Sequence, residues 1–319
     1  MLTAQDIKGM YAIIPTPALP GSEKWDAKKT LDLEETSKLV DKLISDGVSG
    51  LIALGTTGEC ATLTTEEYRE FTKCVLSTIN YRIPCFIGAT ALGTHEVIKR
   101  LNFIEQEGAS GSLLGLPMWQ PLTRQMAVKY YQSISEACPK LTIMAYANAR
   151  AFRFNFDSEF WGQIAEKAPT VTCAKFSNSQ ILLEALKVTN NRINFVPIDS
   201  SAYEFYSLSQ ETTTACWATA ASMGPQPSIA LMNAIKSRNT KLAKEIAVDI
   251  DWANEIVDDI IRDPDLFASY NIQLEKARIS CAGYCNPGPV RPPYDVIPDD
   301  MLDKCRENGR RWATICKKY

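Results

Sequence analysis

Lys175 is the residue whose surroundings most strongly suggest chemistry. It lies near the end of a short, mostly apolar stretch, residues 171–176. Lysine is depleted from β-strands and is almost never fully buried without a reason. An apolar site disfavours the charged amine, so the pKa falls and the amine becomes a nucleophile that can form a Schiff base with a ketone. For an isolated lysine, a solvated residue at a strand edge is the favoured interpretation, so other segments must decide.

Two upstream segments favour the chemical interpretation. Thr56 and Thr57 lie in a Gly-Thr-Thr-Gly-Glu turn after an apolar stretch, and Tyr146 ends another apolar stretch, residues 141–146. The hydroxyl and backbone N–H groups of such a turn can hold a carboxylate, while a phenol can transfer a proton. Together with a Schiff-base lysine, these are the parts that an α-keto acid aldolase needs.

The elements that must position these residues alternate along the chain. Amphipathic, helix-like stretches separate eight expected strands: 11–15, 50–54, 83–88, 111–116, 141–146, 171–176, 193–198 and 214–218. This alternation predicts an α/β fold, a (β/α)8 TIM barrel with its active site on the loops that follow the strands. A doubly wound sheet is the alternative, but the Gly-rich phosphate-binding turn typical of that fold is absent.

The pattern becomes purely helical after the last expected strand. We predict a barrel with the active site over 1–239 and a C-terminal helical extension over 240–319. The helices expected from about residue 226 onward are 228–237, 240–262, 266–283 and 298–316. A Pro-rich stretch, residues 286–293, must be extended or turning, and we interpret it as a simple spacer.

The composition of the 319 residues is that of a globular enzyme. The chain is 45% apolar and 22% charged, with a net charge of −3. This charge gives no strong attraction to nucleic acid or anionic membranes, and no apolar run reaches the ~20 residues of a membrane span. The N-terminus lacks the charged and apolar regions of a signal peptide, so we expect a cytoplasmic protein with a small-molecule substrate.

The cysteines and the single histidine argue against other chemistries. Ten cysteines are scattered without a CxxC pair, and we expect reduced thiols with structural roles. A Cys-His or Ser-His dyad would have to use His95, which we expect at the surface near a helix start. One histidine also excludes a His-rich metal site, so we expect no metal.

These residues resemble a known group of enzymes. The Gly55–Glu59 turn, the strand ending at Tyr146 and the strand containing Lys175 are similar in order and spacing to the dihydrodipicolinate synthase and N-acetylneuraminate lyase superfamily of pyruvate-dependent class I aldolases. The resemblance implies a (β/α)8 barrel with a helical extension, assembled as a homotetramer. It also implies that no cofactor is needed, because the lysine supplies the electron sink.

Two segments depart from the synthase and sialic-acid branches. Residues 117–121, Pro-Met-Trp-Gln-Pro, replace paired aromatic residues, and Arg150 is out of register for the arginine that grips a second carboxylate in the synthase. The chain instead resembles the hydratase-aldolases of aromatic degradation over nearly its whole length. The segments that carry this resemblance are 117–119, 146–148, 216–217, 270–276 and 290–294.

The resemblance assigns roles to individual residues. Lys175 forms the Schiff base with an arylidene pyruvate, Tyr146 shuttles protons at the C4 oxygen, and Thr56 and Thr57 hold the carboxylate. The products are pyruvate and an aromatic aldehyde. Further candidates for substrate binding are Trp119 and Trp217 as flat walls for the aryl group, Asn271 as an orienter of substrate or water, and Asn148, with Arg150, near a ring substituent.

Each of these candidates also has an ordinary structural interpretation, and two rival functions remain. Without the resemblance, each Trp could equally be a core or interface residue, and Asn148, Arg150 and Asn271 could be ordinary loop or surface residues. One rival function is another pyruvate-dependent aldolase that acts on a sugar acid or a semialdehyde. The other is a non-catalytic barrel that only binds a keto acid.

Overall fold

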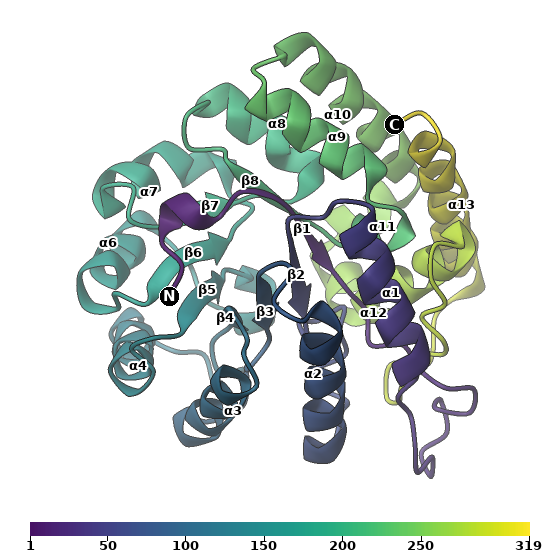
Figure 1. The fold of residues 1–319 in the computed structure, drawn as a ribbon, viewed down its shortest axis with the longest axis horizontal. Helices are drawn as coiled ribbons and strands as arrows, with labels where there is room; N and C mark the ends of the chain where they lie inside the picture. Colours follow the sequence, from purple (N-terminus) through teal and green to yellow (C-terminus); the bar gives the residue numbers. More distant parts are fainter.

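Eight parallel strands form the centre of the molecule in the computed structural model, which describes residues 1–319 (Figure 1). The strands are β1 Gly9–Ile13, β2 Gly50–Ala53, β3 Cys85–Ile87, β4 Gly111–Leu114, β5 Thr142–Tyr146, β6 Val171–Lys175, β7 Asn194–Val196 and β8 Ala215–Ala218. Their order is sequential from β1 to β7, with β8 beside β1. A bridge between Ile198 and Trp217 brings the two edges together, and the predicted (β/α)8 barrel is confirmed.

Helices surround this barrel, as Figure 1 shows. They are α1 Leu33–Ser45, α2 Thr65–Ile79, α3 Thr94–Gln106, α4 Arg124–Ala137, the short α5 Ala149–Phe152, α6 Ser158–Lys167, α7 Leu182–Thr189, α8 Asp199–Leu208 and α9 Gln226–Lys236. The helix α2 begins with a capping box, in which Thr64 and Glu67 each accept the other's backbone N–H. The helix α8 lies between β7 and β8, where the alternation of strands and helices predicts one.

The interior of the barrel is packed with side chains from every strand. The inward-facing residues are Ile7, Tyr11, Ile13, Ile52, Phe86, Leu113, Met144, Cys173, Val196, Ala215 and Trp217. The N-terminal segment closes the amino-terminal end of the strands, where Thr142 and Thr172 bond to the backbone of Leu2. The other end of the barrel is therefore the end left for a site.

The C-terminal extension packs against one side of the barrel. Its helices are α10 Thr240–Asn254, α11 Asp258–Arg262, α12 Pro264–Ala282 and α13 Asp299–Cys316. Figure 1 shows them in green to yellow beside α9 and α1. The prediction of one continuous helix over 240–262 is wrong, because a 3-10 turn at Glu255–Val257 separates α10 from α11. The buried Trp312 anchors α13 to the barrel by donating to the carbonyl of Gly224 at 2.9 Å.

The Pro-rich stretch is not a simple spacer, and that interpretation is wrong. Arg291, in its middle, is only 2% exposed. The nearby Gly288 packs against the backbone of Ala18, where a Cβ at position 288 would come within 1.9 Å of the carbonyl oxygen of Ala18. The stretch is therefore part of the packed structure.

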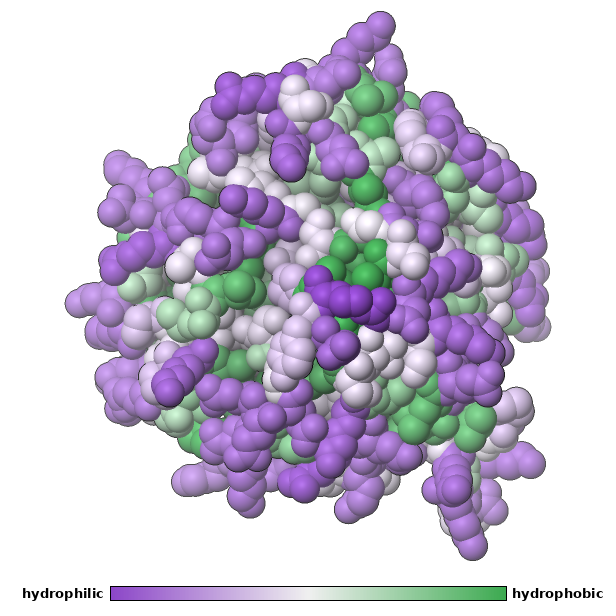
Figure 2. Space-filling view, in the orientation of Figure 1, coloured by the Kyte–Doolittle hydropathy of each residue, from purple (hydrophilic) through white to green (hydrophobic).

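The surface and the thiols fit the sequence-based expectations where they can be compared. The three cysteines expected inside strands, Cys85, Cys173 and Cys216, are buried, and His95 is exposed. On the face seen in Figure 2, hydrophilic residues predominate and hydrophobic ones form small separate patches. None of the helices has the length and apolar character required to cross a membrane.

Candidate active site

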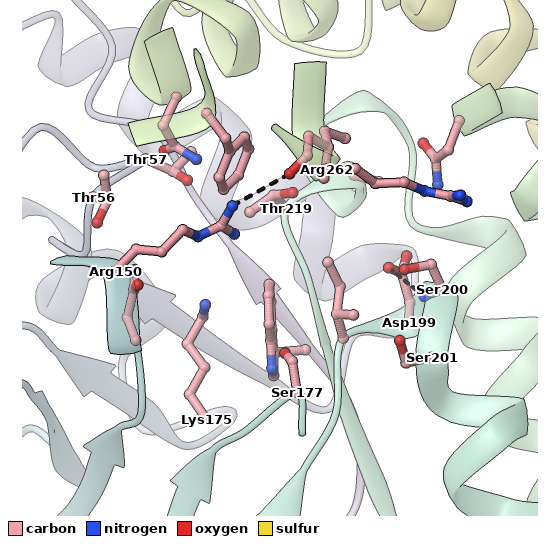
Figure 3. A pocket seen from close by; sticks show the side chains of 18 of the residues that line it. Thr56, Thr57, Arg150, Lys175, Ser177, Asp199, Ser200, Ser201, Thr219 and Arg262 are labelled. Carbon is pink, nitrogen blue, oxygen red and sulfur yellow. Dashed lines mark hydrogen bonds between the residues drawn. The ribbon is translucent and has the colours of Figure 1, made fainter. Parts of the chain in front are cut away.

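A cavity of about 1050 Å³ opens at the carboxyl ends of the strands. Its wall includes the predicted residues Thr56, Thr57, Tyr146, Lys175 and Trp217. The two threonines follow β2, Tyr146 and Lys175 end β5 and β6, and Trp217 lies within β8. In Figure 3, Lys175 and Arg150 point into the same space, and Asp199, Ser200 and Ser201 lie on its opposite side. Residues far apart in the sequence therefore meet where a barrel places its active site.

Lys175 is held between two aromatic rings. It ends β6 in register with Tyr146, the last residue of the neighbouring β5. Its Nζ lies 3.3 Å from the centroid of the Trp217 ring and 4.5 Å from that of Tyr146. Burial lowers the pKa of Lys175 to about 7, although the negative charge of Glu275 opposes the shift. A large fraction of the amine is thus neutral and nucleophilic near neutral pH.

Tyr146 is a protonated phenol with two polar partners. Its hydroxyl lies 3.2 Å from Oγ1 of Thr56 and accepts a hydrogen bond from Nδ2 of Asn148 at 3.1 Å. Burial raises the pKa of Tyr146, and these two hydrogen bonds oppose the rise. Because its hydroxyl can both donate and accept a hydrogen bond, the phenol of Tyr146 can transfer protons to and from a bound oxygen.

Asn148 has a more specific position than the sequence could show. Its Oδ1 accepts from the backbone N–H of Ala151 and caps α5, while its Nδ2 donates to Tyr146. It also lines the cavity. The side chain therefore orients the phenol in this structure, which leaves direct contact with a substrate as a prediction.

The turn that contains Thr56 and Thr57 is tightly constrained. Leu54 and Glu59, which flank it, both have positive φ, 58° and 52°. Gly58 fits because a Cβ at this position would come within 2.7 Å of the backbone nitrogen of Leu54. Non-glycine residues keep such conformations only where surrounding contacts hold them. A rigid turn of this kind suits the binding of one small anion.

Trp217 and Asn271 form two further parts of the wall. The indole N–H of Trp217 donates to the carbonyl of Val196 at 3.1 Å, which fixes the ring against Lys175. Asn271 enters from α12, and its Oδ1 is buried without any hydrogen-bond partner. An unpaired buried amide oxygen is costly unless a ligand or water donates to it.

Trp119 is not brought to this cavity. Its side chain is 79% exposed, and its backbone carbonyl accepts from Nη2 of Arg153 at 3.0 Å. The expectation that Trp119 forms a wall of the pocket is therefore not met in the chain by itself. Residues 117–123 form a connection without helical or strand periodicity, so the sequence could not show where this ring would point.

Three buried charged groups near the cavity were missed. Glu275 and Arg278 of α12 form an ion pair with two contacts of 2.9 Å, and Arg278 also donates to Oγ1 of Thr219 at 2.6 Å. Asp199 accepts from Ser228 at 2.6 Å, and burial raises its pKa to about 6. A signal was present in α12, where Glu275, Lys276 and Arg278 fall within four positions of a helix that does not separate an apolar from a polar face.

Arg150 crosses the upper part of the cavity (Figure 3). Its guanidinium lies 4.5 Å from the centroid of the Phe267 ring, and Nη1 donates to the carbonyl of Ile261 at 3.3 Å. Partial burial lowers its pKa without making it neutral. A cation stacked on an aromatic ring at this position can meet a polar group on a flat ligand.

The barrel thus carries a partly buried lysine of lowered pKa, a phenol with two hydrogen-bond partners and a paired-threonine turn at the carboxyl ends of its strands, where barrel enzymes have their active sites. The model of the dihydrodipicolinate synthetase family matches residues 20–308. The chain belongs to this family, and the sequence-based identification of the family is confirmed.

Among curated relatives, the chain is 39% identical to a trans-O-hydroxybenzylidenepyruvate hydratase-aldolase of Pseudomonas putida, over 100% of this chain and 96% of that protein. It is 35% identical to a trans-2'-carboxybenzalpyruvate hydratase-aldolase of Nocardioides sp. (strain KP7), with the same coverage. Among solved structures, it is similar to PhdJ bound to a substrate intermediate, with a TM-score of 0.95 and 32% identity over 100% of this chain and 99% of that chain.

Proposed function

We propose that this protein is a Schiff-base hydratase-aldolase that converts an arylidene pyruvate and water into an aromatic aldehyde and pyruvate, as a step in the degradation of aromatic hydrocarbons. The observation that carries the proposal is the position of the Lys175 amine, which lies between the rings of Trp217 and Tyr146 in a cavity that also contains the two threonines. The full-length similarity to hydratase-aldolases supports the choice of substrate class.

Hydration is the first half of the reaction. The neutral amine of Lys175 attacks the keto carbon, and Tyr146 donates the proton with which the keto oxygen leaves as water. The product is an iminium conjugated with the C3–C4 double bond, beside the Tyr146 phenolate. Thr56 and Thr57 hold the carboxylate. The iminium withdraws electrons, so water adds at C4 and one of its protons passes to this phenolate. Tyr146 then protonates the resulting enamine at C3, which gives a 4-hydroxy iminium and restores the phenolate.

Cleavage is the second half. Tyr146 takes the proton from the C4 hydroxyl, the C3–C4 bond breaks, and its electrons flow into the iminium. The aldehyde leaves, and the enamine of pyruvate remains on Lys175. Protonation at C3 and hydrolysis of the iminium release pyruvate and restore the amine. The lysine is the electron sink throughout, and the chain's own residues account for every step.

The wall of the cavity favours an aryl group. The aromatic residues that line it include Phe156, Phe176, Trp217, Trp252 and Phe267. Flat apolar surfaces suit an aryl ring better than a hydroxylated sugar. We assign the unpaired Oδ1 of Asn271 to the substrate or the attacking water, and we place Arg150 near a substituent of the ring.

We also propose that the enzyme acts in the cytoplasm as a homotetramer. All ten cysteines are free, which suits a reducing compartment. Met118, Trp119 and Met126 expose large apolar side chains on the connection before α4 and on α4 itself. Exposed apolar groups that lie close in sequence support a contact between subunits.

A small panel of substrates tests the function. An o-substituted benzylidenepyruvate should lose its conjugated absorbance and yield equimolar aldehyde and pyruvate. In the reverse direction, pyruvate with a benzaldehyde derivative should react faster than pyruvate with aspartate semialdehyde or N-acetylmannosamine. A faster reaction with the semialdehyde or the sugar would contradict the aryl substrate and leave the Schiff base intact. Trapping of pyruvate without turnover of any substrate would favour the non-catalytic barrel.

A further inference from the structure

Three fully buried charged side chains meet behind the carboxylate-binding turn. We call them the Glu59 cluster: Glu59 of the turn, Lys276 of α12 and Arg291 of the Pro-rich stretch, each at most 2% exposed. One carboxylate oxygen of Glu59 lies 2.6 Å from Nζ of Lys276 and 2.6 Å from Nη1 of Arg291. Charges are buried in this way only when they are paired and their hydrogen bonds are met.

Every hydrogen-bond donor of Arg291 has a partner. Its backbone N–H donates to the second oxygen of Glu59 at 2.9 Å. Its five guanidinium N–H groups reach Glu59 and the backbone or hydroxyl oxygens of Thr16, Pro17 and Thr30. A guanidinium whose five donors are all used fixes its partners in one geometry, which an ammonium cannot do.

Lys276 connects the same carboxylate to the extension. Its Nζ donates to the carbonyl of Pro289 at 2.7 Å in addition to Glu59. Although burial lowers its pKa to about 8, the residue is not part of the cavity wall, which includes its helical neighbours Glu275 and Asn271. Lys276 is therefore a structural partner of Glu59 and does not reach the substrate.

The turn itself depends on Glu59. The backbone N–H of Glu59 donates to the carbonyl of Thr56 at 2.9 Å and closes the turn. Oγ1 of Thr16 donates to the carbonyl of Gly58 at 2.7 Å. Because Glu59 has a positive φ of 52°, the backbone here needs external contacts to keep its shape, and the Glu59 cluster supplies them.

We propose that Arg291 and Lys276 are positioning residues, which act through Glu59 to hold Thr56 and Thr57 in the geometry that binds the keto-acid carboxylate. The extension would then set the affinity for one end of the substrate without touching it. This inference rests on the proposed function, because it requires a carboxylate at the turn.

The test compares pyruvate with acetone, which has the ketone but no carboxylate. Borohydride trapping on Lys175 is measured for both ketones in the wild type, Glu59→Gln and Arg291→Lys. We expect each variant to raise the half-saturating pyruvate concentration by about tenfold or more, the usual loss for a weakened hydrogen bond to a charged group. Trapping at saturating pyruvate, and trapping with acetone, should stay near wild-type values.

The two variants also separate positioning from simple electrostatics. Glu59→Gln removes a negative charge near the turn, so an electrostatic effect alone would make pyruvate bind more tightly. Arg291→Lys keeps the positive charge and loses the fork of donors, so an electrostatic effect alone would change nothing. Unchanged or tighter pyruvate binding in both variants would overturn the proposal. So would an equal loss of trapping with pyruvate and with acetone, which would indicate general damage to the fold.

Controls keep the inference distinct from the proposed function. Lys304→Met removes an exposed ion pair with Asp259 in the extension and should leave both ketones unaffected. A wild type that does not trap pyruvate would refute the proposed function, whereas a wild type that traps it with unaffected variants would refute only the positioning. If the variants do not fold, hydrogen exchange of the wild type decides: trapped pyruvate should slow exchange at residues 56–60 and 288–291 together, and protection of the turn alone would contradict the link.

Discussion

The two halves of the cavity are built differently. The half that we propose receives the keto acid consists of Lys175, Tyr146 and the threonine turn. All three lie at strand ends and are held by neighbouring rings, hydrogen bonds or the Glu59 cluster. The aryl half is formed by loops and by helices of the extension, with Asn271 left unpaired and Arg150 held by one backbone carbonyl and one ring.

This difference suggests how one family serves many substrates. The chemistry of the Schiff base is the same for every keto acid, so the residues that perform it gain from rigid strand positions. The second reactant varies, and loops can change without disturbing the barrel. Substitutions in the keto-acid half should therefore affect catalysis for every substrate, whereas those in the aryl half should change the choice among substrates.

Lys175→Ala should have the largest effect. It removes the amine, so turnover and the borohydride adduct with pyruvate should both disappear. Peptide mapping of the wild-type adduct should identify Lys175, although Lys276 also has a lowered pKa. An adduct on Lys276 would break the proposed assignment of the keto-acid half. Lys187→Ala, at an exposed position of α7, serves as the control and should keep both activities.

Tyr146→Phe should slow turnover by about 10²–10⁴-fold, the usual contribution of general acid–base catalysis. The ring that faces Lys175 remains, so pyruvate should still be trapped. The variant also removes the partner of Thr56 and Asn148. Steady-state turnover measured beside single-turnover trapping separates the two steps. Turnover close to that of the wild type would exclude Tyr146 from proton transfer.

Thr57→Val should lower catalytic efficiency for all keto acids by about 10- to 150-fold, because a hydrogen bond to a charged group contributes roughly 1.5–3 kcal/mol. The side chain keeps its shape and remains buried in the turn, where Thr57 is 5% exposed. The loss should be similar for aryl and non-aryl partners when each is compared with wild type. Unchanged efficiency would mean that the carboxylate binds elsewhere.

The pH dependence of Schiff-base formation should reflect Lys175. Its lowered pKa of about 7 means that the amine is protonated and unreactive below this pH. Trapping should therefore rise with pH through about 7 and then level off. Glu275→Gln removes a negative charge that raises this pKa, so the rising limb should move to lower pH. A shift to higher pH, measured from trapping rates across the range, would contradict the assigned influence of Glu275.

The barrel and the keto-acid half could be predicted from the sequence because both rest on local patterns. Each strand is a short apolar run, and Thr57, Tyr146 and Lys175 lie at or just after the ends of such runs, so barrel geometry brings them together. The helix break at residue 255 was missed. Its local pattern is weak, and packing against neighbouring helices decides it.

The remaining features depend on contacts between distant segments. The sequence gives no reason for Arg291 to meet Glu59, which is 232 positions away. A Pro-rich stretch of this kind is compatible with either an exposed spacer or a buried, packed segment. The positions of Trp119 and Asn148 depend on loop geometry, which side-chain periodicity does not encode. The domain boundary at 239/240 lies in the short connection between α9 and α10 and stays a prediction.

The aryl half provides the smallest and most selective effects. Asn271→Ala should reduce turnover of arylidene pyruvates more than trapping of pyruvate, because its unpaired Oδ1 lies in the cavity wall.

Trp119→Ala should change neither aryl turnover nor pyruvate trapping by more than a few-fold if the exposed ring only meets another subunit. It should instead weaken the proposed tetramer. Turnover of a panel of ring-substituted substrates and sedimentation of each variant provide the measurements. If Trp119→Ala reduces aryl turnover while the assembly stays intact, the ring reaches the substrate after all, and the aryl half extends beyond the cavity of the single chain.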